Sequence, residues 1–282
     1  MSAAANLRPD AKRVLADVDG PLVLVGAGKM GSALFEGWLA LGLDLEKLVV
    51  IEPQPSPAIT AHTGLRLNPD LHGLKAKAIV IAVKPQLAPD VVPKLGTLVD
   101  AATIVVSIMA GRRLAFLEKS LPAGTAIVRA MPNTPAAVGR GITVAVANRA
   151  AAGNQRTLAD RLLGATGLVE WVADETLLDA VTAVSGSGPA YVFLLAESLA
   201  RAGAAAGLPN DLAERLARAT VDGAGELLHR STLDAATLRT NVTSPGGTTA
   251  AALEVLMDKD GLDPLLEKAV AAATQRSRDL AG

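Results

Sequence analysis

The sequence predicts an α/β domain built on a mostly parallel sheet, followed by an all-α domain. Two observations carry this prediction. Apolar runs of strand length alternate with segments of helical length in the first part of the chain, and the strand pattern stops after "GLVEWVADE". A chain of 282 residues is also long enough for two domains. We predict an N-terminal extension over residues 1–19, a first domain over 20–172 and a second over 173–282.

The composition narrows the classes of function. Half of the residues are hydrophobic but only 2% are aromatic, so the core must be aliphatic. The net charge of −1 gives no electrostatic footprint for nucleic acid or for an anionic membrane surface. The chain has no cysteine, and its three histidines, at positions 62, 72 and 229, share no metal-ligand spacing. We therefore expect no metal site and no nucleic-acid partner.

No segment is typical of export or membrane insertion. Residues 1–19 lack the apolar centre of a signal peptide. No uncharged apolar run reaches the roughly 18 residues that a membrane helix needs. We predict a soluble cytoplasmic protein without a membrane partner.

Five apolar runs of strand length occupy the first half. The first, Leu22–Val25, is apolar throughout, as expected for a central parallel strand covered on both faces. The others are "LVVIE" ending at Glu52, "AIVIAV" (78–83), "TIVVSI" (103–108) and "TAIVRAM" (125–131). Segments of helical length separate most of them, which predicts right-handed crossovers between parallel strands.

A GxGxxG motif, "GAGKMG", lies between the first strand and a helix-patterned segment. Gly26 permits a tight turn, Gly28 lets a pyrophosphate approach the backbone, and Gly31 allows the helix to pack close to the strand. An acidic residue, Glu52, ends the next strand about 20 residues later, where it can accept hydrogen bonds from an adenosine ribose. This context predicts a dinucleotide-binding site.

Glu52 also bears on which dinucleotide binds. A carboxylate there would repel the 2′-phosphate of NADPH, and no arginine occurs in the next ten residues, "PQPSPAITAH". The electrostatics of this position favour NADH, and both NADPH and NADH stay open as cofactors.

Two further loops follow strands at the predicted cofactor edge: "AVKPQ" (82–86) and "AMPNTP" (130–135). Ligands of open α/β sheets bind beyond the carboxyl ends of the strands. Lys84 can reach a phosphate or a ribose from the first loop. Asn133 lies between two prolines that stiffen the second loop, which suits the nicotinamide end of a cofactor.

The second half is patterned as helices. "SGSGPAYVFLLAESLARAGAAAGL" predicts one long helix that is apolar almost all round, and such a helix must be buried. In a domain of this size, a second copy of the chain is the simplest way to bury it. Further helices are predicted over 210–230, over a short segment at 234–240, after the glycines at 246 and 247, and over 263–281. We predict that this domain dimerises.

The stretch "NVTSPGGTTAAALEVL" (241–256) prepares a helix start with hydroxyls instead of charges. Its proline and glycines expose backbone N–H groups at a helix N-terminus, which suits a carboxylate. Ser244 adds a hydroxyl to this nest, and Thr248 and Thr249 can hydrogen-bond a group beside the carboxylate. The pattern favours an amino or imino acid as the ligand.

Five motifs together resemble one known family. "GAGKMG", "AVKP", "RAMPNTP", "AVSGSGPAYVF" and "SPGGTT" occur in the order and at the spacings of the pyrroline-5-carboxylate reductases, over roughly residues 21–275. The resemblance implies a Rossmann domain followed by a helical dimerisation domain, with dimers that often assemble into decamers. It also implies reduction of the cyclic imine 1-pyrroline-5-carboxylate to L-proline by NADPH or NADH, as the last step of proline biosynthesis.

The resemblance assigns roles to individual residues. The cofactor-binding residues would be Gly26, Ala27, Gly28, Lys29, Met30, Gly31, Glu52, Asn68, Ala82, Val83, Lys84, Pro85, Met109, Ala110 and Asn133. The substrate carboxylate would contact Ser244, Gly246, Gly247 and Thr248. Thr249 would hydrogen-bond the ring nitrogen as the catalytic residue, and Glu175 would lie near the substrate.

Two alternatives stay open. One keeps the fold and changes the substrate to another cyclic imine carboxylate. The other is a nucleotide-binding protein of this fold without turnover. The chain also departs from the family before the SPGG stretch, where "LDAATLRTNV" replaces an "HPxxLKD"-like run.

Overall fold

The computed structural model describes residues 15–281. These residues form two compact units. The first runs up to Gly186 and also takes in the end of the chain from Thr274, and the second is Ser187–Ala273. The predicted boundary at 172/173 stays a prediction. The compact units divide later in the chain, because the turn and short helix after residue 173 pack with the sheet.

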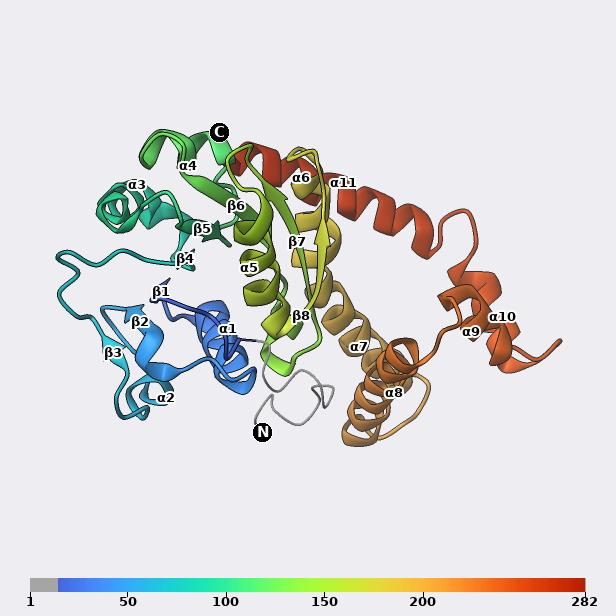
Figure 1. Ribbon diagram of the computed structural model, residues 1–282. Coiled ribbons are helices and arrows are strands. Elements are labelled where there is room, and N and C mark those ends of the chain that lie inside the picture. Colours follow the sequence, from blue (N-terminus) through green and yellow to red (C-terminus); the bar gives the residue numbers. More distant parts are fainter. Residues whose placement is uncertain (1–14, 282) are drawn as a thin grey trace. The chain divides into compact units, whose positions relative to one another are not determined.

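The first unit is built on one eight-stranded sheet (Figure 1). In the order β3-β2-β1-β4-β5-β6-β7-β8, the first six strands are parallel to their neighbours, β7 is antiparallel to β6, and β8 is parallel to β7. The predicted mostly parallel sheet is therefore confirmed. The strands are β1 (Leu22–Val25), β2 (Leu48–Ile51), β3 (Arg66–Leu67), β4 (Ala78–Ile81), β5 (Ile104–Ser107), β6 (Ala126–Met131), β7 (Gly141–Ala147) and β8 (Gly167–Trp171).

Helices cover both faces of this sheet. Trp38 and Phe35 of α1 (Lys29–Ala40) pack with Leu158 and Leu162 of α5 (Gly153–Leu163) in one apolar cluster. A second cluster on the opposite face contains residues of the 3₁₀ helix η5 (Val92–Leu98) and of α4 (Leu114–Ser120). The other α-helices that lie wholly in this unit are α2 (Pro57–Thr60), α3 (Ala88–Val91) and α6 (Leu177–Val181). Coverage on both faces explains why the central strands are apolar throughout.

The register of the sheet sets where the loops emerge. Val25 at the end of β1 pairs with Ile51 of β2 on one side and with Ile81 of β4 on the other. The residues that follow these three strands therefore leave the sheet side by side. Gly37 allows a close approach elsewhere in this unit, between α1 and the segment just after α5: a Cβ on it would lie 2.6 Å from the carbonyl oxygen of Ala165.

Two of residues 15–19, Leu15 and Val18, belong to the packed core of the first unit. Leu15 is fully buried, and its N–H donates to the carbonyl of Leu41 at 3.1 Å. Asp17 forms an ion pair with Arg161 of α5. The rest of the predicted N-terminal extension, residues 1–14, lies outside the described residues.

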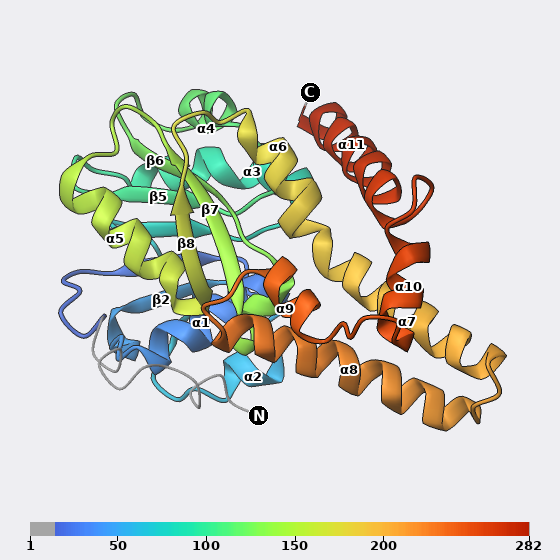
Figure 2. The ribbon, with the colours of Figure 1, turned by 90° about the vertical axis from the view of Figure 1, so that its right-hand side faces the viewer.

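The second unit contains helices only. They are α7 (Gly188–Ala205), α8 (Asn210–Arg230), α9 (Ala235–Asn241), α10 (Thr248–Leu256) and most of α11 (Leu262–Ala281), close to the predicted segments. α7 and α8 lie against each other as a helical hairpin (Figure 2). This confirms the prediction of an all-helical second part.

Apolar side chains of this second unit are exposed in the single chain. α7 has no buried residue, and its Phe193 is 64% exposed. In α8 the buried residues are the small Ala213 and Ala217. A continuous helical stretch, Leu177–Ala205, is long and apolar enough to cross a membrane by length and composition alone. Such a surface requires a cover, and an oligomeric partner supplies one.

Candidate active site

The glycine loop after β1 packs tightly against the end of β4. A Cβ on Gly31 would lie 2.1 Å from the carbonyl oxygen of Gly26. Gly26 has a φ of 94°, and a Cβ there would lie 2.8 Å from the carbonyl of Ala82. Neither position can accept a side chain. Gly28, by contrast, has nothing within 4 Å of the point where a Cβ would stand, so this part of the loop faces open space.

The start of α1 is suited to an anion. The helix begins at Lys29 with Gly28 as its N-cap, and no side chain of the described residues caps it. The first N–H groups of such a helix, together with the positive end of the helix dipole, attract a phosphate. Open space at Gly28 and an uncapped helix start together fit the pyrophosphate of a dinucleotide.

Glu52 lies directly beside this loop. Its Oε2 accepts a hydrogen bond from the N–H of Ala27 at 2.8 Å, and its Oε1 accepts one from Gln54 at 3.0 Å. Asn68, which follows β3, holds the backbone of the same residue. Its Oδ1 accepts from the Glu52 N–H and its Nδ2 donates to the Glu52 carbonyl, both at 2.9 Å. The sequence predicted the carboxylate at this place but not the hydrogen bonds that fix it.

The loop after β4 is held by a cation that the sequence analysis did not single out. The N–H of Ala82 donates to the carbonyl of Val25 at 2.7 Å, which continues the pairing of β1 and β4. Arg112 donates from Nε to the carbonyl of Pro85 at 2.9 Å and stacks over the Phe116 ring. Lys84 is exposed in this loop and can contact a bound anion.

The loops after β5 and β6 complete this edge. Met109 is buried and Ala110 is exposed. Asn133 uses its Oδ1 to accept from the N–H of Ile142 at 3.0 Å, which ties its loop to β7. Part of the side chain that was predicted to hold the nicotinamide end is therefore engaged in holding its own loop.

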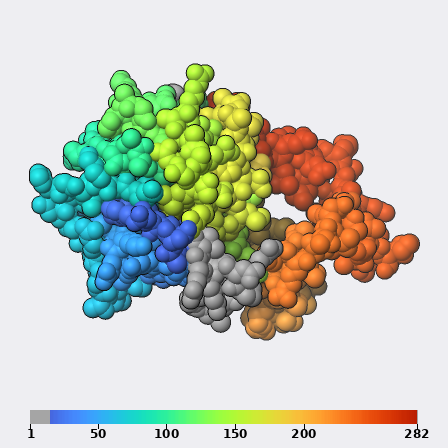
Figure 3. Space-filling model, viewed as in Figure 1, coloured from blue at the N-terminus to red at the C-terminus, as the bar shows by residue number. Residues whose placement is uncertain are grey.

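All predicted cofactor residues lie at one edge of the sheet, at the carboxyl ends of the six parallel strands. The segments around β2 and β3, blue to cyan in Figure 3, form one continuous surface of the first unit. In strand order from β1 to β6, the residues that leave this edge are Gly26–Gly31, Glu52, Asn68, Ala82–Pro85, Met109–Ala110 and Asn133. This is the edge at which open parallel sheets bind ligands.

The predicted substrate residues fall into both units. Glu175 is in the first unit, and the SPGG loop is in the second. In this loop the N–H of Gly247 donates to the carbonyl of Ser244 at 3.0 Å, and Gly246 has a φ of 68°. α10 then begins at Thr248, and no side chain of the described residues caps it. The predicted helix start with available N–H groups is present.

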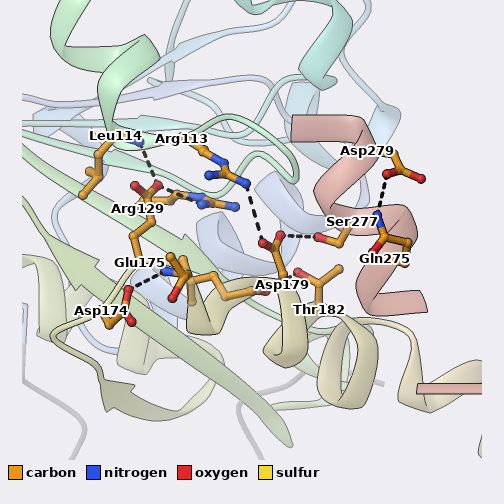
Figure 4. Close-up of polar contacts among 12 residues, drawn as sticks. Arg113, Leu114, Arg129, Asp174, Glu175, Asp179, Thr182, Gln275, Ser277 and Asp279 are labelled. Carbon is orange, nitrogen blue, oxygen red and sulfur yellow. Dashed lines mark hydrogen bonds and ion pairs between the residues drawn. The ribbon is translucent and has the colours of Figure 1, made fainter. Parts of the chain in front are cut away.

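Glu175 forms a partly buried ion pair that the sequence analysis missed (Figure 4). Its Oε1 accepts from Nη1 of Arg129 on β6 and from the N–H of Leu114 at the start of α4, both at 2.8 Å. The Arg129 side chain is only 5% exposed. The neighbouring Asp174 accepts from Thr176, and these hydrogen bonds lower the pKa of the Asp174 carboxyl group below its ordinary value.

A second polar contact joins α6 to the end of the chain. Asp179 is buried, and its Oδ1 accepts from the hydroxyl of Ser277 on α11 at 2.8 Å. Its Oδ2 lies 3.7 Å from Nη2 of Arg113 (Figure 4). Neither Asp179 nor Ser277 carries a sequence signal for this contact, since 98 positions separate them.

The "SGSG" motif begins in an unusual turn. Residues Thr182–Gly186 form a π-helical turn at the end of α6. The hydroxyl oxygen of Ser185 is buried there, and among the buried side-chain nitrogen and oxygen atoms of residues 15–281 it is the one without a hydrogen-bond partner. A Cβ on Gly186 would lie 2.6 Å from Cε of Met131, so the turn packs against the end of β6.

The fold and this edge define a Rossmann-type dinucleotide-binding protein with a helical second part. Comparisons with known proteins identify the family within this class. Residues 21–111 match the family described as NADP oxidoreductase, coenzyme F420-dependent, and residues 175–280 match the family described as pyrroline-5-carboxylate reductase dimerisation.

Individual relatives match nearly the whole chain. The pyrroline-5-carboxylate reductase of Mycobacterium leprae is 41% identical over 294 aligned residues, which cover 92% of this chain and 96% of the relative. The solved structure of a pyrroline-5-carboxylate reductase from Coxiella burnetii superposes with a TM-score of 0.86 at 34% identity, over 93% of this chain and 99% of that one. The Plasmodium falciparum pyrroline carboxylate reductase, solved with NADP bound, has a TM-score of 0.78 at 30% identity, over 95% and 100% of the two chains. The chain belongs to the pyrroline-5-carboxylate reductase family.

Proposed function

We propose that this chain reduces the cyclic imine 1-pyrroline-5-carboxylate to L-proline with NADPH or NADH. The observation that carries the proposal is that one chain contains two uncapped helix starts, each suited to an anion. α1 suits a pyrophosphate and α10 suits a carboxylate. The relatives bear the name of this reaction.

The SPGG loop supports a role in carboxylate binding. The turn from Ser244 to Gly247 places Gly247 at the N-cap of α10, so the first N–H groups of the helix point out of its end. Gly246 has open space around it, which lets a ligand approach the backbone. The Ser244 hydroxyl is exposed beside this turn. We assign the substrate carboxylate to Ser244, Gly246, Gly247 and Thr248.

The chemistry requires positioning more than a strong acid or base. A protonated cyclic imine already has an electrophilic carbon, and the reduced nicotinamide supplies a hydride to it. The electron pair of the carbon–nitrogen double bond then remains on nitrogen, which becomes the amine of proline. Alignment of two bound reactants can account for roughly 7–11 kcal/mol of a barrier. We assign Thr249, next to the carboxylate site, to orient the ring nitrogen by a hydrogen bond.

We also assign Glu175 to the surroundings of the substrate. Its Oε1 is engaged by Arg129 and Leu114, so its other oxygen is the one that would contact a ligand. The cofactor residues of the proposal are those at the carboxyl edge of the sheet. There the glycine loop holds the pyrophosphate, and the loops after β4, β5 and β6 line the nicotinamide half.

The proposal includes an assembly and a location. The family match to a dimerisation domain spans the exposed apolar helices, including the whole stretch Leu177–Ala205. We therefore assign the cover of this surface to a second copy of the chain and not to a membrane or a nucleic acid. Charged residues such as Glu197 and Arg201 on α7 are consistent with a protein partner. A decamer built from dimers and a cytoplasmic location complete the proposal.

Steady-state kinetics of two hydroxyl variants test the site assignment. Thr249→Ala removes the hydrogen bond to the nitrogen, so we expect kcat to fall about 10- to 100-fold with little change in KM. Ser244→Ala weakens carboxylate binding, so we expect KM to rise about 10-fold with kcat nearly kept.

Thr240→Ala is the matched control. Its hydroxyl donates to the carbonyl of Ala236 within α9, outside the SPGG loop. We expect this variant to keep both constants. Near-normal kinetics in Thr249→Ala and Ser244→Ala alike would overturn the assignment of this loop.

A further inference from the structure

The Glu52 carboxylate is fixed on both of its oxygens. Oε2 accepts from the N–H of Ala27 inside the glycine loop, and Oε1 accepts from the N–H of Gln54. Both contacts come from backbone groups, which do not rotate away as side chains do. The negative charge is therefore held at the junction of the glycine loop and the end of β2.

Asn68 holds the backbone beneath this carboxylate. Its side-chain amide pairs with both the N–H and the carbonyl of Glu52, as a neighbouring strand would. Its own N–H donates to the carbonyl of Val50 at 2.8 Å. Asn68 has a φ of 47°, the one positive φ of a non-glycine residue in the part of the chain that the structure describes. Asparagine tolerates this left-handed conformation better than most residues.

Glu52 forms no ion pair with a basic side chain among the described residues. Residues 53–61 contain no lysine or arginine. The carboxylate is therefore an acceptor for ribose hydroxyls and a source of repulsion for a phosphate in the same place.

We propose that Glu52, positioned by Asn68, makes this site select a dinucleotide whose adenosine ribose carries a free 2′-hydroxyl, which is NADH and not NADPH. The inference rests on the proposed function for the use of a nicotinamide cofactor, and it goes further by naming the residues that choose it. Glu52 is the specificity-determining residue. Asn68 is a positioning residue, since its side-chain contacts are with Glu52 and not with the open side of the loop.

Direct binding of the two cofactors to the purified protein, without imine, tests this. Titration followed by the fluorescence of the reduced nicotinamide should give a dissociation constant for NADH about 100-fold below that for NADPH. In competition with the bound cofactor, 5′-AMP should bind more tightly than adenosine 2′,5′-bisphosphate. These two ligands isolate the adenosine end.

Three variants test the charge of Glu52 and its positioning by Asn68 separately. Glu52→Gln removes the repulsion and one acceptor, so we expect the NADH preference to fall at least about 10-fold. Asn68→Gly keeps the positive φ without strain and removes only the two hydrogen bonds of the side-chain amide to the Glu52 backbone. Because Glu52 stays charged, we expect a smaller but measurable fall in the NADH preference. Glu46→Gln is the control, because this exposed glutamate precedes β2, at the opposite edge of the sheet. It should leave the preference unchanged.

The outcomes distinguish this inference from the proposed function. Equal or tighter binding of NADPH by the unmodified protein would overturn the inference. An unchanged preference in Glu52→Gln would do so as well. Retained NADH selectivity in a protein that does not reduce the imine would overturn the proposed function and support the cofactor assignment. Failure to bind either dinucleotide would overturn both.

Discussion

The three glycines of the loop after β1 have different physical roles. Gly31 is required for packing, because a Cβ there would overlap the carbonyl oxygen of Gly26 at 2.1 Å. Gly26 is required for its positive φ and for the closeness of Ala82. Gly28 has neither constraint, since nothing lies within 4 Å of its would-be Cβ. An unconstrained glycine at this point indicates space that is kept for a ligand.

Alanine substitutions should separate packing from binding at these positions. We expect Gly31→Ala to push α1 away from the sheet and to lower the free energy of unfolding by about 1–3 kcal/mol. We expect Gly28→Ala to leave stability within about 0.5 kcal/mol of the unmodified protein while dinucleotide affinity falls about 10-fold. Denaturant unfolding and cofactor titration measure the two effects. Equal stability of the two variants would contradict the packing argument.

Residue-scale features differ in how far the sequence predicts them. The glycine loop and Glu52 were predictable, because the motif and the end of the next strand are read from local patterns. Asn68 entered only through the family resemblance. Its contact with Glu52 depends on the pairing of β2 with β3, which is two residues long and carries almost no apolar pattern.

At the scale of elements, polar contacts join α6 to its neighbours. Glu175, just before α6, holds Arg129 on β6 and the first N–H of α4. Asp179 within α6 holds Ser277 of α11. Both contacts are between elements that are far apart in the sequence. They fix the start of the "SGSG" segment against the sheet edge that carries the cofactor residues.

Breaking the Arg129–Glu175 pair should destabilise the first unit strongly. Glu175→Ala leaves the Arg129 charge buried without its partner, so we expect a loss of about 3 kcal/mol and a Tm lower by about 6–12 °C. Glu170→Ala, an exposed glutamate on β8, is the matched control and should change Tm little. Calorimetry measures both. An equal Tm for the two variants would show that the Arg129–Glu175 pair does not hold these elements together.

The elements were largely predictable, and their long-range contacts were not. All five apolar runs of the first half are strands, and the helices of the second half lie close to their predicted ranges. β7 was not among the predicted runs, and it is the strand that runs antiparallel to β6. The end of α11 belongs to the first unit, and no local sequence pattern predicts this, because its hydrogen bond from Ser277 to Asp179 joins residues far apart in the sequence.

At the scale of the whole molecule, the second unit exposes an apolar surface that association would cover. Its helices expose large apolar side chains such as Phe193 and Val255, and its buried residues are mostly small. The sequence predicted this from the all-round apolar character of the segment after "SGSG". The family match to a dimerisation domain agrees with it. Self-association is therefore the cover that we expect for this apolar surface.

Turnover of the imine by the purified protein tests the central claim most directly. The measurement is the initial rate of NADH and of NADPH oxidation with 1-pyrroline-5-carboxylate, together with identification of L-proline as the product. We expect turnover of the order of 10 s⁻¹ at saturation and a higher kcat/KM with NADH. Binding of NADH without any oxidation in the presence of this imine would contradict the account, since the anion sites would then serve another substrate or no reaction.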